Sequence, residues 1–102
     1  MDITHKNLFD EATFTANGIV TKVLAETDSA KHVLFCMKAD TEISEHTSTK
    51  ETVVTVIKGK GIFMLEGEEI KMVPGIFIPM EPNAKHAISA EEDLIFVLGL
   101  TG

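Results

Sequence analysis

Histidine is the residue type in this chain best suited to bind a transition metal or to carry a proton near neutral pH, and the chain has four. His46 and His86 each follow a polar, turn-like segment and precede a run of β-forming residues. His5 lies in a polar leader and His32 begins an apolar run, so neither points to a site. His46 and His86 are therefore the first candidates for chemistry, with two hydrogen-bonded pocket histidines and no metal as the alternative.

The elements that must position these histidines are predicted to be strands. Short runs rich in Val, Ile, Phe and Thr are separated by Gly, Pro and Asn, and no segment has apolar residues at helical spacing with caps. We predict an all-β protein with about eight strands and no helix longer than about two turns. The strands are expected at residues 19–24, 32–37, 53–57, 62–65, 70–73, 76–78, 86–89 and 94–98.

Glycines indicate where the chain reverses direction. Gly67 can supply the positive φ of a tight hairpin between residues 62–65 and 70–73. Gly59 and Gly61 mark a bend that can pass the chain from one sheet to another. The acidic residues at turn-like positions are expected to be solvated, and they are Glu66, Glu68, Glu69, Glu91, Glu92 and Asp93.

The length of 102 residues predicts one domain with one core. A net charge of −7 disfavours binding to nucleic acid or to an anionic membrane surface. The leader lacks the features of a secretion signal and no run approaches about 20 apolar residues, so we expect a soluble, cytoplasmic protein. Cys36 cannot form an internal disulfide and is expected to be a buried small hydrophobe. The small core and the apolar run 33–37 also predict a homodimer.

The stretch from residue 40 to residue 59 resembles the first motif of the cupin superfamily. That motif has a glycine, five residues, His-x-His, three or four residues, a glutamate, six residues and a glycine. Asp40 stands at the first glycine and His46 at the first histidine, while Ser48 replaces the second histidine. Thr52 replaces the glutamate, and Gly59 matches the last glycine.

A second stretch resembles the second cupin motif, which has a glycine, five residues, Pro-x-Gly, two residues, a histidine, three residues and an asparagine. Gly75 and His86 match the motif, whereas Glu81 and Ala90 replace its proline and asparagine. Asn83 stands at the second glycine and is one of the few other residue types that enter the left-handed region readily. Both motifs occur in the expected order and are separated by a predicted hairpin.

The resemblance covers residues 20–100 and implies a double-stranded β-helix, the jelly-roll barrel of small, single-domain bacterial cupins. It implies an N-terminal arm at residues 1–17 and a barrel domain at residues 18–102. It also implies that His46 and His86 converge in the barrel pocket.

In metal-binding cupins, three histidines and one glutamate hold an iron, manganese, nickel or zinc ion. Because Ser48 and Thr52 replace two of these ligands, the resemblance implies that His46 and His86 hold a divalent metal weakly or hold none. Glu51 is a candidate third ligand. A regular strand would point its side chain out of the barrel, whereas a bulge just before it would turn the side chain inward.

The predicted function is the binding of a small molecule, and of a weakly held divalent metal, at His46 and His86. Without Trp or Tyr, the pocket suits a small apolar or weakly polar ligand. One alternative is a metal-dependent dioxygenase or isomerase acting on a small molecule, and another is a non-catalytic structural or interaction module. The expected pocket residues are Ser48, Thr52, Phe63, Phe77, Met80 and Phe96.

Overall fold

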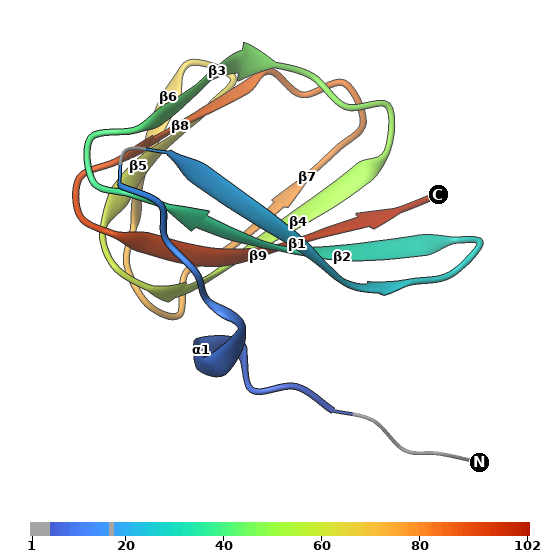
Figure 1. Ribbon diagram of the computed structural model, residues 1–102. Helices are drawn as coiled ribbons and strands as arrows, with labels where there is room; N and C mark the ends of the chain where they lie inside the picture. The colour runs from blue at the N-terminus through green and yellow to red at the C-terminus, as the bar shows by residue number, and fades with distance from the viewer. Residues whose placement is uncertain (1–4, 17) are drawn as a thin grey trace.

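A computed structural model describes residues 5–16 and 18–102 as two antiparallel sheets packed face to face (Figure 1). The strands are β1 (Ile19–Glu26), β2 (Ala30–Met37), β3 (Glu42–His46), β4 (Glu51–Lys58), β5 (Gly61–Leu65), β6 (Glu68–Met72), β7 (Phe77–Met80), β8 (His86–Ala90) and β9 (Leu94–Thr101). One sheet has the order β1-β2-β9-β4-β7 and the other has the order β3-β8-β5-β6. The predicted all-β jelly-roll barrel is thereby confirmed.

Helix is nearly absent from the described ranges, where it is limited to the four residues of α1 (Leu8–Glu11). Asn7 caps this turn, because its side-chain oxygen accepts hydrogen bonds from the Phe9 and Asp10 backbone N–H groups. The prediction of no helix longer than two turns is confirmed for this part of the chain. No helix within it is long and apolar enough to cross a membrane.

β3 is the strand that the sequence pattern did not predict. Its side chains are exposed apart from the partly buried Ile43, so the segment lacks the apolar alternation of a half-buried strand. The strand forms because it pairs with β8, where Ile43 lies opposite Ile88. His46 consequently ends a strand and does not begin one, which corrects the sequence interpretation.

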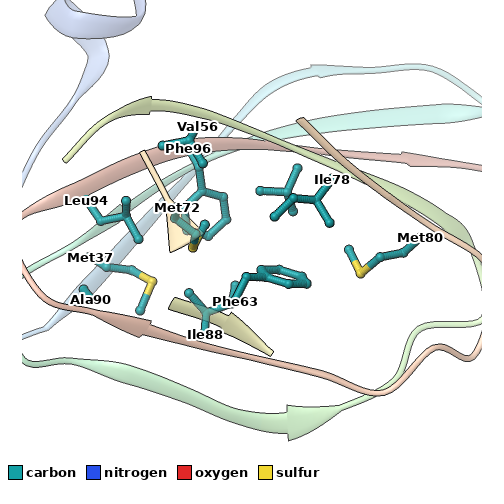
Figure 2. Packing of buried hydrophobic residues seen from close by; sticks show 11 residues of the cluster. Met37, Val56, Phe63, Met72, Ile78, Met80, Ile88, Ala90, Leu94 and Phe96 are labelled. Carbon is teal, nitrogen blue, oxygen red and sulfur yellow. The ribbon is translucent and has the colours of Figure 1, made fainter. Parts of the chain in front are cut away.

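The space between the sheets is filled by apolar side chains (Figure 2). Along β4 the burial alternates, so that Thr52, Val54 and Val56 face the interior. Phe63 from the opposite sheet and Phe96 from β9 are fully buried among them. Each such large side chain contributes about 1.5–3 kcal/mol through its removal from water. The packing of this interior therefore accounts for much of the stability of the barrel.

A second, smaller cluster lies on the outer face of the five-stranded sheet. Leu34 and Cys36 of β2 are buried there against Leu8 and Phe14 of the N-terminal arm. This cover explains why β2 is apolar on both faces. The prediction that Cys36 is a buried hydrophobe is confirmed.

Gly59 takes the chain from β4 in one sheet to β5 in the other, as predicted for the bend at this position. Its φ of 100° lies in the region that favours glycine, and a Cβ at this position would overlap the Asp93 carbonyl oxygen. The Asp93 side chain is 42 % exposed, as expected, and it also bonds to the turn after β2. Its carboxylate accepts hydrogen bonds from the Ala39 backbone N–H, at 2.9 Å, and from Lys38 Nζ, at 3.1 Å.

Candidate functional site

His46 and His86 lie directly opposite each other on the neighbouring strands β3 and β8. A shift in register between Ile43 and His46 brings the last residue of β3 into line with the first residue of β8. The two imidazole centroids are 4.1 Å apart and the ring planes are inclined by 59°. One ion or one small polar group can therefore contact both rings.

The backbone fixes which nitrogen of each ring is free. His46 Nδ1 is 2.9 Å from the Ser44 carbonyl oxygen, and His86 Nδ1 is 2.9 Å from the Ala84 carbonyl oxygen. A carbonyl oxygen only accepts hydrogen bonds, so Nδ1 donates in both cases. In the neutral imidazoles the lone pair is then on Nε2, the nitrogen left to bind a metal or to accept a hydrogen bond.

The two rings differ in exposure. His86 is 4 % exposed, and its ring lies parallel to that of Phe63, with the centroids 5.9 Å apart and the planes inclined by only 3°. His46 is exposed at the end of its strand. The pair thus consists of one imidazole held inside the barrel and one at its rim.

Hydrogen bonds between loops connect the segments that carry the two histidines. The Asn83 backbone N–H, three residues before His86, donates to the Ser48 carbonyl oxygen, two residues after His46, over 2.6 Å. Next to β5, which flanks β8 on the side opposite β3, the Glu66 carboxylate accepts from the backbone N–H of Lys85, the residue just before His86, over 2.8 Å. The sequence interpretation assigned Glu66 to solvent and did not predict this hydrogen bond. The one sequence signal for it is the residue type, because a two-residue turn usually has Asn, Asp or Gly at this position.

The two hydroxyl residues at ligand positions of the first motif bond to their own loop. Thr52 is 2 % exposed, and its Oγ1 donates to the Lys50 carbonyl oxygen over 3.2 Å. Ser48 Oγ accepts from the Lys50 backbone N–H, also over 3.2 Å. Within residues 5–16 and 18–102, no group of three or more His, Cys, Asp or Glu side chains is placed to hold a metal ion. The donor set fits an open site of two imidazoles and does not fit a closed four-ligand site.

Three residues proposed from the sequence lie away from the histidine pair. Glu51 is exposed, because the regular alternation along β4 points it outward while Thr52 points inward, so it does not join the two imidazoles. Phe77 is 62 % exposed, because β7 is an edge strand whose other face, with Ile78 and Met80, is buried. Phe96 is fully buried in the core and has no surface left to line a pocket. Phe63 is also fully buried and lines no pocket, although it lies against the His86 ring.

Met80 and Thr52 are the expected pocket residues that line open space. Met80 takes part in two grooves, of about 410 Å³ and about 440 Å³, that share Pro79, Met80 and Glu81, and Thr52 lines the second. The first groove reaches Leu65, which pairs with His86, and Ala84, whose carbonyl oxygen holds the His86 ring. The groove therefore adjoins the histidine pair, although neither histidine lines it.

All four glycine positions of the two motifs have positive φ. The φ angles are 69° at Asp40, 100° at Gly59, 94° at Gly75 and 68° at Asn83. Asp and Asn are among the non-glycine residues that tolerate this region best. Asp40 and Asn83 therefore adopt the positive φ that glycine at these motif positions would favour.

Comparisons with known proteins agree with this fold. The chain has a TM-score of 0.88 and 22 % identity with an RmlC-like cupin from Desulfovibrio desulfuricans, over 98 % of this chain and 97 % of that one. It has a TM-score of 0.87 and 20 % identity with a conserved protein of unknown function from Streptococcus pyogenes, over 99 % and 89 % of the two chains. With the DMSP lyase DddQ from Ruegeria pomeroyi, the TM-score is 0.77 and the identity 18 %, over 83 % of this chain and 47 % of that one.

These identities are low, so the structural matches show a shared fold and nothing about activity. No curated protein matches the chain. The family model described as the cupin domain matches residues 33–99, which include both histidines and most of the strands. The chain therefore belongs to the cupin family.

Proposed function

We propose that this cupin binds a small molecule at the end of the barrel where His46 and His86 meet, with the two imidazoles as its polar contacts. The observation that carries the proposal is the pairing of two rings 4.1 Å apart, each with Nδ1 held by a backbone carbonyl. Holding both rings in the same tautomer leaves two Nε2 lone pairs ready to accept from one donor group. The ligand we favour has a hydrogen-bond donor and an otherwise apolar or weakly polar body.

The groove beside the pair supports this class of ligand. Its apolar lining comes from Leu65, Met80 and Ala84, and its carboxylates come from Glu66 and Glu81. Carboxylates at a groove repel anions, and the net charge of −7 acts in the same direction. A neutral or cationic small molecule is therefore the better fit.

The same pair is proposed to bind a divalent transition metal weakly. His46 and His86 would hold the ion through Nε2, and the remaining coordination positions would be left to water or ligand. When bound, such an ion would act as a Lewis acid toward an oxygen atom of the ligand. The bonds from Nδ1 to the Ser44 and Ala84 carbonyls orient the rings for that role.

The test is calorimetric titration of untagged, chelator-treated protein with Ni²⁺ and Zn²⁺. We expect measurable binding that falls at least about tenfold in His46→Ala and in His86→Ala, because each change removes half of the donor set. His32→Ala is the matched control, since His32 is an exposed histidine on β2. Equal affinities in all four proteins would refute the shared site while leaving the fold unaffected.

Two other functions predicted from the sequence remain alternatives. A dioxygenase or isomerase would use the same two histidines. It would be supported by turnover of a substrate that is observed only when the metal ion is present. A non-catalytic module is favoured by the apolar filling of the barrel interior (Figure 2), which confines any ligand to one end. This second alternative predicts that neither histidine variant changes any binding property.

The predicted homodimer also remains a proposal. It is supported by β1, which lies at the edge of its sheet with Ile19 exposed and Val23 52 % exposed. Light scattering at high protein concentration is expected to give twice the monomer mass, and Val23→Lys is expected to reduce it. A monomeric mass for the unaltered chain would reject the dimer.

A further inference from the structure

Glu66 occupies a backbone position that does not suit its residue type. Leu65 pairs with Glu68 across the β5–β6 hairpin, so the turn consists of Glu66 and Gly67 alone. Both have positive φ, 49° at Glu66 and 82° at Gly67, as in the type I′ turns that favour Asn, Asp or Gly at the first position. A non-glycine residue in such a strained conformation persists only where surrounding contacts hold it there.

The side chain and backbone of Glu66 together hold one residue of the neighbouring loop. Its carboxylate Oε1 accepts from the Lys85 backbone N–H over 2.8 Å. Its own backbone N–H donates to the Lys85 carbonyl oxygen, also over 2.8 Å. Asn or Asp would suit the turn better, but each is one methylene shorter and reaches less far across to the Lys85 N–H group.

Lys85 immediately precedes His86, so this double contact acts on the backbone that carries the buried imidazole. Ala84, on the other side of Lys85, supplies the carbonyl oxygen that holds His86 Nδ1. The Glu66 contacts and the ring contact therefore lie within one three-residue segment. A shift of the Lys85 backbone would change both the direction of the His86 ring and the oxygen that selects its tautomer.

We propose that Glu66 is a positioning residue for His86. It keeps an unfavourable turn conformation in order to fix the Lys85 backbone, and thereby it presents Nε2 of His86 beside His46. This inference rests on the proposed function only where it concerns binding, because the orientation and tautomer of His86 are properties of the free protein.

The test compares Glu66→Asn, Glu66→Gln and Glu68→Asn. Glu66→Asn suits the turn, but its side chain is too short to reach the Lys85 N–H group. Glu66→Gln keeps both the side-chain length and an acceptor oxygen. Glu68→Asn is a matched control at the other end of the turn. Glu68 is exposed and lies opposite Leu65. The readouts are the melting temperature, the Ni²⁺ affinity, and the ¹⁵N chemical shifts of the His86 ring, which distinguish its two neutral tautomers.

We expect Glu66→Asn to melt at or above the temperature of the unaltered protein, to mix the His86 tautomers, and to bind Ni²⁺ about 10–100-fold more weakly. Glu66→Gln and Glu68→Asn should keep the original ring shifts and affinity. A purely structural role predicts a lower melting temperature with unchanged ring shifts, and that result would overturn the inference. If the unaltered protein binds no Ni²⁺, the proposed metal site fails, whereas the ring shifts still decide the role of Glu66.

Discussion

The two ends of the barrel differ in the chemistry of what they bury. At one end, where β2 ends and β9 begins, Met37, Ala90 and Leu94 are buried (Figure 2). Gly59 lies close to the Asp93 carbonyl at this end. At the other end, β3 stops and β8 starts. Among residues 5–16 and 18–102, the buried polar side chains are Thr52 and His86, and both are at this second end. We call the first the packed end and the second the histidine end.

The difference separates stability from function along the length of the barrel. Apolar burial at the packed end stabilises the fold in proportion to the area removed from water. Burial of an imidazole and a hydroxyl at the histidine end costs free energy unless each is hydrogen-bonded, and each is bonded to a local carbonyl. The histidine end thus buries polar groups that are hydrogen-bonded within their own loops. Substitutions there should affect binding more than substitutions at the packed end.

The largest effects are expected when the same charged residue is placed at each end of the barrel. Thr52 and Val56 lie on the same face of β4, and each is at most 2 % exposed. Thr52→Glu and Val56→Glu should each destabilise the metal-free protein by roughly 3 kcal/mol or more, because each buries a carboxyl group that has no hydrogen-bond or ion-pair partner in place. Urea denaturation, monitored by circular dichroism, measures both losses.

Addition of Zn²⁺ should then distinguish the two variants. Thr52 occupies the glutamate position of the first cupin motif, so the carboxylate introduced by Thr52→Glu would add a third donor to the two imidazoles. We expect Zn²⁺ to restore stability to Thr52→Glu and not to Val56→Glu, in proportion to the logarithm of the ion concentration. Equal recovery, or recovery of neither variant, would show that the two ends do not differ as we describe.

Much of the fold could be predicted from the sequence because its signals are local. β5 and β6 follow from two β-forming runs around Gly67, whose φ is 82° as a tight turn requires. The bend at Gly59 follows from a glycine that no other residue can replace without overlapping Asp93. The positive φ of Asn83 was likewise expected from its residue type. In each case one or two residues determine the backbone.

What the sequence could not show depends on distant partners. β3 carries no apolar alternation, and it exists because β8, far along the chain, supplies its hydrogen-bond partners. Phe77 sits in an unbroken apolar run, so nothing local indicates that its side of an edge strand is uncovered. The contact from Glu66 to Lys85 joins two turns, and no pattern within either turn specifies it. Site geometry of this kind requires the assembled fold.

The smallest predicted effect concerns the packed end, where Asp93 joins the turn after β2 to the turn before β9. The pKa of the Asp93 carboxyl is held below its ordinary value of 3.8, mainly by the hydrogen bond from the Ala39 backbone N–H and then by the one from Lys38. Lys38 Nζ also lies 6.0 Å from the centre of the Phe14 ring, which connects this ion pair to the N-terminal arm.

Because the folded-state pKa lies below the unfolded one, the ionised Asp93 stabilises the protein above about pH 4, and this contribution is lost as the pH falls through the folded-state value. Asp93→Asn should therefore be less stable than the unaltered protein at pH 7, and the difference should shrink below about pH 4, as measured by urea denaturation at both pH values. Asp28→Asn changes an exposed carboxyl in the β1–β2 turn and should show neither effect.

The Ni²⁺ affinity of Asp93→Asn should equal that of the unaltered protein, since the hydrogen bonds of Asp93 lie at the packed end. A difference in stability that persists undiminished at about pH 3 would contradict the assigned role of the carboxylate, and a loss of Ni²⁺ affinity would contradict the independence of the two ends.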